Sequence, residues 1–232
     1  MDDQATMQAA EKPRRPAFLN RFWMVFVQPG KLFESLGRNP AWFPITLFVA
    51  VATGAIALLI PFELVEEQMR AWGMASGDID AARGLATIAT VAGTIIFLPI
   101  MTVVVSTVTY VIFVFMRGDE ATYRQHLCVV AHSGIISLAG TAITIPLQIR
   151  AGDLELALSL GTFAPFLPEG FLLTFLNVMP LFQLWAIAVT GIGLAVLDPR
   201  RSAGRTIAVL MVLQVIVALA CAGFATAVSP TF

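Results

Sequence analysis

Long apolar stretches without a charged residue restrict what this 232-residue chain can fold into. A helix that crosses the ~30 Å hydrocarbon layer of a bilayer needs roughly twenty apolar residues. Five stretches of that kind, free of Asp, Glu, Lys and Arg, cover residues 43–62, 85–116, 127–149, 171–197 and 207–228. The pattern predicts an all-α integral membrane protein, a bundle of five transmembrane helices whose membrane domain occupies residues 43–228.

The composition agrees with a membrane protein and excludes other classes. Hydrophobic residues make up 58% of the chain and charged residues 12%, whereas about a quarter of a soluble domain is charged. A net charge of −1 offers nucleic acid no electrostatic attraction. We therefore expect the lipid bilayer, and no nucleic acid, as a partner. Two cysteines are too few for a disulfide framework.

The basic residues indicate an orientation. Eleven of the fourteen Lys and Arg residues fall before the first stretch or in the loops after the second and fourth stretches. The other three, Arg70, Arg83 and Arg150, fall on the opposite side. Because cytoplasmic loops carry the excess of basic residues, we expect a multi-pass protein of the cell (inner) membrane with a cytoplasmic N-terminus. Residues 229–232 would form an outer C-terminal tail. No cleavable signal peptide is expected, so the first stretch stays as an anchor.

The region before the first stretch divides into two parts. Residues 1–16 are polar, and we expect a disordered cytoplasmic tail. In residues 17–42, aromatic residues recur every fourth position, which predicts an amphipathic helix lying at the lipid headgroups. The segment either aligns the first span or docks a partner protein. Its candidate contact residues are Phe18, Phe22, Trp23, Phe26, Pro29, Phe33, Pro40 and Trp42.

The predicted spans carry one ionisable side chain at depth, His132, with Cys128 one helical turn before it. The pair could present two metal ligands on one face, but no further ligand is available at that depth. Packing with one hydrogen bond is the preferred interpretation. We expect no catalytic residue, no metal and no cofactor, and hence no enzyme.

Small and weakly polar residues lie at helical spacing within the predicted spans. Such residues let helices approach closely and form interhelical hydrogen bonds. Asn177 and Gln214 are costlier to bury, so each should bond across helices or face a wet cavity. The alternative to helix packing is a polar conduit between the second, third and fifth spans. The candidate residues are His132, Ser133, Ser137, Gly140, Thr144, Asn177, Gln214, Thr102, Ser106 and Thr109.

One outer loop is expected to contain a helix. Asp153 is a suitable N-cap for residues 154–160, and Gly161 would end that helix. Such a helix would rest on the outer leaflet or contact another protein.

The segment over residues 29–42 has a proline, a phenylalanine four residues on, an aliphatic residue three further, and then Pro40 and Trp42. It resembles the segment that precedes the first span in bacterial members of the Yip domain family, named for interaction with Ypt/Rab GTPases. Arg117-Gly118 and the following residues 123–132 also resemble the family. The Asp-Leu-Tyr-Gly-Pro stretch of eukaryotic members is absent, so Rab-dependent trafficking is not transferred to this chain.

The resemblance covers residues 29–228 and implies five spans and a non-enzymatic protein that acts through other membrane components. Some bacterial relatives sit beside export ABC transporters. The resemblance thus implies a membrane adaptor or organiser, or an accessory subunit of a transport system such as an ABC-type exporter. Such a protein would act as a homo-oligomer or within a membrane-transport complex. The alternative is a small oligomeric channel or a lipid/small-molecule conduit.

Overall fold

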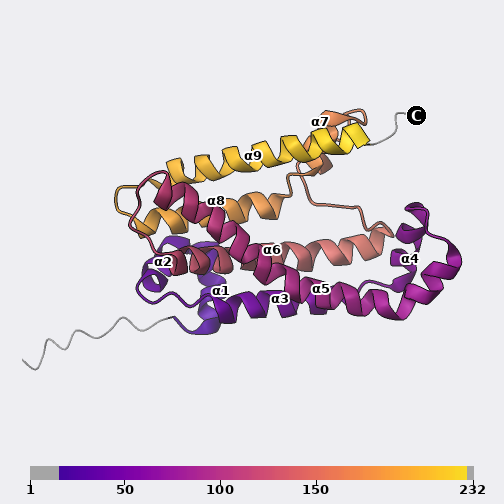
Figure 1. The fold of residues 1–232 in the computed structure, drawn as a ribbon, viewed down its shortest axis with the longest axis horizontal. Coiled ribbons are helices and arrows are strands. Elements are labelled where there is room, and N and C mark those ends of the chain that lie inside the picture. Colours follow the sequence, from indigo (N-terminus) through magenta and orange to yellow (C-terminus); the bar gives the residue numbers. More distant parts are fainter. Residues whose placement is uncertain (1–15, 229–232) are drawn as a thin grey trace, which may run out of the picture.

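The computed structural model describes residues 16–228, which are folded almost entirely into helices and contain no β-strand in that range. This confirms the all-α prediction. The π-helical turn Val111–Phe115 continues α5, and a short 3-10 turn, Gly161–Phe163, precedes α7. The helices are α1 (Phe18–Val27), α2 (Pro29–Gly37), α3 (Phe43–Ala57), α4 (Phe62–Ala71), α5 (Ser76–Tyr110), α6 (Tyr123–Ala151), α7 (Phe171–Asn177), α8 (Leu181–Leu197) and α9 (Ala203–Val228) (Figure 1).

Three helical stretches of the described chain are long and apolar enough to cross a bilayer alone: α5 with its π-helical turn, α6 and α9. The bent pair α3 and α4, whose axes differ by 85°, raises the number to four if it counts as one span. The fourth predicted stretch, residues 171–197, is divided into α7 and the 17-residue α8. Pro61 and Pro180 occupy the N-cap positions of α4 and α8. Proline cannot donate the backbone bond that would continue a preceding helix, so both breaks fall there.

The helices pack side by side around α6. Helix α6 contacts α3 and α8, α5 lies against α3 and α6, and α9 lies against α8 and α7. The buried core combines aliphatic residues of α3, α6 and α8, among them Ile45, Ile136 and Leu194. Gly191 of α8 lets that helix approach α9 closely. A Cβ added at Gly191 would lie 2.9 Å from the Ile207 Cα atom.

The N-terminal helices are part of this core. Val25 of α1 and the Leu32, Phe33 and Leu36 side chains of α2 are completely or almost completely buried. Aromatic rings extend the contact, since the Phe26 and Trp185 ring centroids lie 5.2 Å apart. The opposite face of α1 stays apolar and open. It exposes Leu19, Trp23 and Val27. Residues 1–15 of the predicted tail and the outer tail at 229–232 lie outside the described residues.

The predicted helix over residues 154–160 is wrong. The backbone there pairs instead with the segment before α8, through bonds from Leu160 N to Met179 O and from Leu181 N to Leu158 O. The side chain of Gln148 donates to two further carbonyls of the loop, at 2.9 Å each. Asp153 accepts a bond from Glu155 N and thereby forms a turn rather than a helix cap. These hydrogen bonds give the backbone N–H and C=O groups of the loop their partners without a helix. A buried backbone group must be hydrogen-bonded, but the partner does not have to lie in the same helix.

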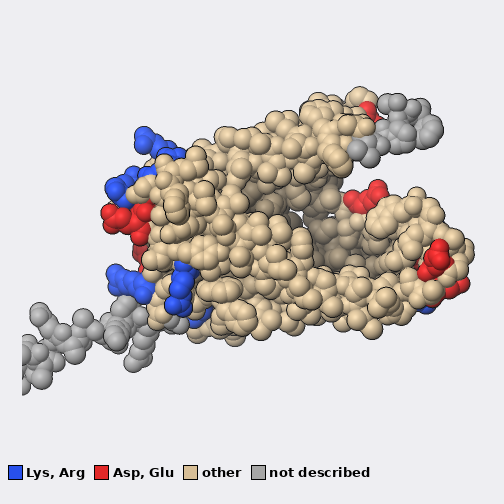
Figure 2. Space-filling model, in the orientation of Figure 1, with Lys and Arg blue, Asp and Glu red and all other residues tan. Residues whose placement is uncertain are grey.

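The two ends of the bundle differ in charge. Lys and Arg side chains gather at the end that holds α2 and the α5–α6 and α8–α9 loops (Figure 2). We call this the basic end. Acidic side chains predominate at the opposite end, which holds α4 and the loop over residues 152–170, and we call this the acidic end (Figure 2).

Candidate functional site

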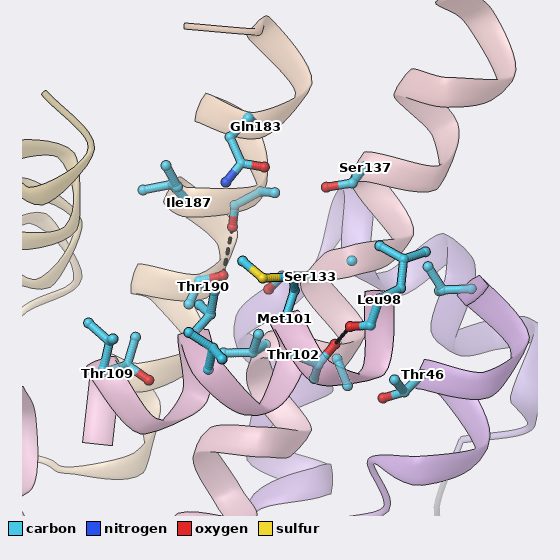
Figure 3. Close-up of a pocket in the computed structure, with 18 of the residues that line it drawn as sticks. Thr46, Leu98, Met101, Thr102, Thr109, Ser133, Ser137, Gln183, Ile187 and Thr190 are labelled. Atoms are coloured by element: carbon cyan, nitrogen blue, oxygen red, sulfur yellow. Dashed lines mark hydrogen bonds between the residues drawn. The ribbon is translucent and has the colours of Figure 1, made fainter. Parts of the chain in front are cut away.

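Helices α5 and α9 border a cavity because each packs against other helices and the two are hardly in contact with each other. The cavity has a volume of about 550 Å³ and is lined by residues of α3, α5, α6, α8 and α9. Figure 3 labels lining residues of α3, α5, α6 and α8. Apolar side chains such as Leu98, Met101, Val105 and Leu213 make up much of its wall. Its polar wall residues are Thr46, Thr53, Thr102, Thr109, Ser133, Ser137, Thr141, Gln183, Thr190 and Gln214.

Most of the hydroxyl groups in this wall donate hydrogen bonds to backbone carbonyls of their own helices. Thr46, Thr102 and Thr190 each donate to the carbonyl four residues earlier, at 2.8 to 2.9 Å. Ser133 does the same at 3.0 Å. A hydroxyl satisfied in this way costs little when an apolar group covers it. The wall therefore suits an apolar occupant despite its Ser and Thr residues.

The amides of Gln183 and Gln214 differ from these hydroxyls. Within residues 16–228 neither amide has a hydrogen-bond partner, and both border the cavity. An amide offers both donors and acceptors, so the two side chains supply polar contacts to anything that enters. The sequence left open whether Gln214 bonds across helices or faces a wet cavity, and the structure places its side chain in the cavity wall.

A second hollow continues the cavity toward the acidic end. It has a volume of about 370 Å³ and shares Ser137, Thr141 and Gln183 with the first. Gly140 and Thr144 of α6 line it as well. Figure 2 shows this face of the molecule hollowed between the outer part of α9 and the outer parts of α5 and α6. The two cavities together follow the bundle from its interior to the acidic end.

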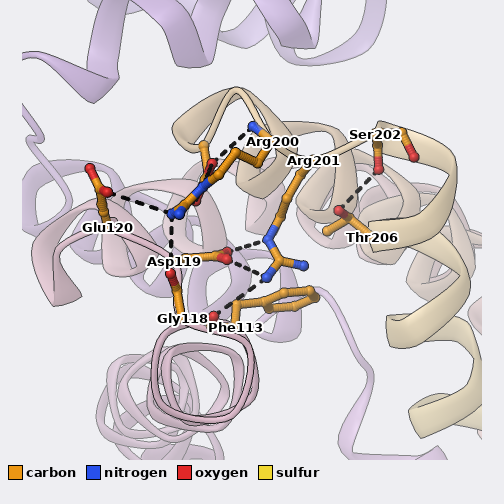
Figure 4. Close-up of polar contacts among 9 residues, drawn as sticks. Phe113, Gly118, Asp119, Glu120, Arg200, Arg201, Ser202 and Thr206 are labelled. Atoms are coloured by element: carbon orange, nitrogen blue, oxygen red, sulfur yellow. Dashed lines mark hydrogen bonds and ion pairs between the residues drawn. The ribbon is translucent and has the colours of Figure 1, made fainter.

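At the basic end of the bundle, a buried ion pair lies on an aromatic ring. Arg201 forms a bidentate pair with Asp119, and their side chains are 9% and 6% exposed. The Arg201 guanidinium lies 4.7 Å from the centroid of the Phe113 ring (Figure 4). Phe113 is fully buried within the π-helical turn. This arrangement ties the α5–α6 loop to the α8–α9 loop.

Arg200 strengthens the same connection. Its guanidinium bonds Asp198 at 2.7 Å and the Gly118 carbonyl at 3.1 Å (Figure 4). The hydrogen bonds from the Arg200 side chain and its backbone N–H hold the pKa of Asp198 below its usual range. The aspartate therefore stays ionised and keeps the loop between α8 and α9 in place.

A third hollow, of about 230 Å³, lies beside this ion pair. We call it the basic hollow. It is lined by Arg117, Asp119, Arg200, Arg201, Ser202, Arg205 and Thr206. This hollow was not predicted from the sequence. The signal that could have found it is that two charged loops, at residues 117–120 and 198–201, fall on the same predicted side of the membrane.

The structure separates the predicted site residues into groups. Thr102, Thr109, Ser133, Ser137 and Gln214 border the main cavity, and Gly140 and Thr144 border its continuation. The remaining three residues of the set lie elsewhere: they are Ser106, Asn177 and His132.

Ser106 is buried, and its Oγ donates to Thr102 O at 2.6 Å. Asn177 lies at the end of α7, where its Oδ1 accepts from Ser159 Oγ at 3.2 Å. Neither side chain contributes to the cavity wall.

His132 is fully buried. Its Nδ1 lies 2.8 Å from the Cys128 carbonyl oxygen and 3.7 Å from Cys128 Sγ. A carbonyl oxygen can only accept, so Nδ1 carries the proton and Nε2 is left as an acceptor without a hydrogen-bond partner. Among residues 16–228, no three His, Cys, Asp or Glu side chains converge in a way that could hold a metal ion.

The N-terminal candidate residues also separate. Phe18, Phe22 and Phe26 pack on the core, Phe33 is buried within it, and Trp23 remains exposed. Pro29 is the first residue of α2, where a missing N–H costs nothing. Trp42 stands at the N-cap of α3 and packs against the core, and Pro40 precedes it in the connecting segment.

The comparison with known families covers nearly all of this architecture. The Yip1 domain matches residues 23–225, from within α1 to the last turns of α9. No curated protein and no solved structure gives a significant match. The Yip1 domain is found in non-enzymatic membrane proteins with apolar helices. The match spans far more than half of the chain and includes both segments that carried the resemblance, so this protein belongs to the Yip1 domain family.

Proposed function

We propose that this protein is a non-enzymatic adaptor or organiser of the cytoplasmic membrane that holds an apolar component of its surroundings in the cavity between α5 and α9. The observation that carries the proposal is the position of that cavity at the side of the bundle. The cavity provides about 550 Å³ of space between two helices that barely touch. Its volume falls within the ~300–1,000 Å³ of sites that bind small molecules. A site reached from the bilayer suits recognition of membrane components.

The proposed topology has five crossings. Helices α3, α5, α6 and α9 each make one, and α7 with α8 makes the other. The excess of Lys and Arg at the basic end supports a cytoplasmic location for that end and an outer location for the C-terminus. The exposed Leu19, Trp23 and Val27 face of α1 supports an interfacial position for the N-terminal segment.

The partners of such an adaptor would be a second copy of the chain or a membrane-transport complex, for instance an ABC-type exporter. The outer face of α1 supports this role because Leu19 is 78% and Trp23 70% exposed while the inner face of the same helix packs on the core. Exposed aromatic and aliphatic residues on a fixed helix are typical of contact surfaces.

A photo-crosslinking experiment tests the function. A photoreactive amino acid is placed at Val217, which lines the cavity and is 47% exposed, and in a separate variant at Ile216, which is 56% exposed and does not line the cavity. We expect a defined adduct from position 217 in living membranes and only diffuse lipid labelling from position 216. Identical adduct patterns at both positions would refute a binding role for the cavity.

The second candidate function is a conduit, and a specific observation favours it. Ser137, Thr141 and Gln183 border both the main cavity and its continuation, so a polar-lined path leads toward the acidic end. Phe113 and the Asp119–Arg201 pair lie at the opposite, basic end. Liposomes containing Phe113→Ala protein should then pass small solutes faster than liposomes containing wild-type protein. Equal flux in the two and in protein-free liposomes would eliminate the conduit.

A further inference from the structure

Residues on one face of α9 line both the main cavity and the basic hollow. Thr206 lines the basic hollow, and Leu210, one helical turn further, lines the cavity. Both side chains are buried. Residues four apart lie on the same side of a helix. The face continues along α9 through Leu213 and Val217, which also line the cavity.

The length of this face matches one leaflet of a bilayer. Arg205 and Val217 are twelve residues apart in α9, which corresponds to ~18 Å along the helix. Half of the hydrocarbon layer is ~15 Å thick. A molecule whose polar group lies at Arg205 would thus reach the middle of the bilayer near Val217.

The arginines of the basic hollow differ in whether an acidic side chain neutralises them. Arg201 is neutralised by Asp119, and Arg200 by Asp198 and, at 3.7 Å, by Glu120. Within the described chain, no acidic side chain pairs with Arg117 or Arg205. Both are exposed. The hydroxyl of Ser202, also in the lining, accepts from Arg205 N at 3.4 Å and keeps its own proton available. These donors favour an anion.

The wall of the main cavity suits an acyl chain. Its volume of about 550 Å³ lies within the ~300–1,000 Å³ range of sites that bind small molecules. The wall hydroxyls that are bonded to their own helices accept a hydrocarbon chain without loss of a hydrogen bond.

We infer that this site binds one anionic phospholipid of the leaflet at the basic end. The phosphate lies between Arg117 and Arg205, and an acyl chain follows the α9 face into the cavity. Basic pockets between membrane helices are suited to anionic headgroups, and guanidinium groups bind phosphate oxygens with charge-assisted hydrogen bonds. The inference rests on the proposed function and identifies the ligand of the same cavity.

Native mass spectrometry of the full-length protein tests the headgroup contact. The protein is reconstituted in vesicles with equal amounts of phosphatidylglycerol and phosphatidylcholine, extracted gently, and its retained lipid is measured. We expect retained phosphatidylglycerol to exceed phosphatidylcholine, and the excess to fall roughly tenfold in the R117Q/R205Q variant. The matched control, R38Q/R124Q, removes two exposed arginines of the same end that do not line the hollow, and it should retain the preference.

A second pair of variants tests the acyl-chain contact. Leu213→Trp fills the cavity, whereas Val212→Trp places the same ring on the exposed side of α9. Retained lipid should fall in the first variant and stay unchanged in the second, while both keep the wild-type elution volume. If inorganic phosphate alone displaces the lipid completely, the acyl chain contributes nothing and the inference fails.

The failures of the two proposals are distinguishable. Equal retention of both lipids, or no effect of R117Q/R205Q, overturns the phospholipid inference. In that case a defined adduct at position 217 still supports the adaptor, and a protein adduct there would identify a polypeptide as the occupant. If position 217 gives no defined adduct and no lipid is retained, both proposals fail together.

Discussion

Single glycines decide how closely α8 approaches its neighbours. At Gly193 a Cβ would lie 2.6 Å from a Val129 methyl group and 2.7 Å from the Phe33 ring. At Gly140 of α6 it would meet the Phe182 side chain at 2.7 Å. Gly140 is one of the small residues named as candidates from the sequence, and the structure places both glycines at helix contacts. Close packing of this kind supplies much of the stability of helices in lipid.

Gly191 provides the sharpest test at this scale. Gly191→Ala would bring a methyl group within 2.9 Å of the Ile207 Cα atom, a backbone atom that cannot rotate away. We expect a loss of about 1–3 kcal/mol in unfolding free energy. Gly223→Ala is the control, since no atom lies within 4 Å of the added group, and it should gain about 0.5–1 kcal/mol. Denaturant unfolding in detergent measures both, and equal stabilities would contradict the close approach.

Asp198 gives a prediction on pH. Its hydrogen bonds to Arg200 hold the pKa below the ~3.9 of an unfolded aspartate. A lowered folded-state pKa stabilises the protein above pH ~4, and this contribution is lost as the pH falls further through the folded pKa. Wild-type melting temperature should therefore fall more steeply below pH 4 than that of Asp198→Asn. Parallel melting curves for the two proteins would show that Asp198 contributes nothing.

At the scale of elements, the loops rather than the long helices join the two sides of the cavity. Helix α9 contacts α8 and α7, and α5 contacts α3 and α6. The link between α5 and α9 is made at the basic end, where Asp119 and Gly118 bind Arg201 and Arg200. The π-helical turn that ends α5 contributes Phe113, whose carbonyl and ring both contact Arg201. Turns of this type are frequent at functional sites.

Breaking the Asp119–Arg201 pair should loosen this link. Asp119→Asn leaves the Arg201 charge buried without a counter-charge, and loss of one partner of a buried pair costs about 3–5 kcal/mol. Glu66→Gln instead removes two partly exposed pairs at the acidic end, with Arg70 and Arg83, where the expected cost is about 0–1 kcal/mol for each pair. A double-mutant cycle with Arg201→Met measures the coupling. A coupling energy near zero would mean that the pair does not hold the loops together.

At the scale of the whole molecule, the separation of charge gives the bundle a direction. The basic loops lie at one end although they are far apart in the sequence, and the acidic loop and α4 lie at the other. The polar residues Glu63, Glu66 and Glu67 of α4 explain why it turns by 85° from α3 rather than extending it. Ionised carboxylates remain in water instead of entering the hydrocarbon layer.

Thiol labelling checks the proposed topology. In a variant with Cys128 and Cys221 replaced by Ala, single cysteines are introduced as Ser202→Cys at the basic end and Met74→Cys at the acidic end; both positions are exposed. A membrane-impermeant maleimide should label position 74 in intact cells and position 202 only after permeabilisation. The reverse pattern would invert the orientation, and labelling of both in intact cells would contradict the odd number of crossings that the proposed topology places between them.

The sequence by itself determined the all-α class, the apolar segments, the family and the distribution of basic residues among the loops. These properties follow from contiguous residues, because hydropathy and helical periodicity are local. Only the tertiary structure decided that α5 and α9 leave a cavity between them, that Thr102 borders it while Ser106 does not, and that Asp119 meets Arg201 across 82 residues of chain. Such contacts join segments distant in sequence, and they depend on how whole helices pack rather than on the preferences of any one segment.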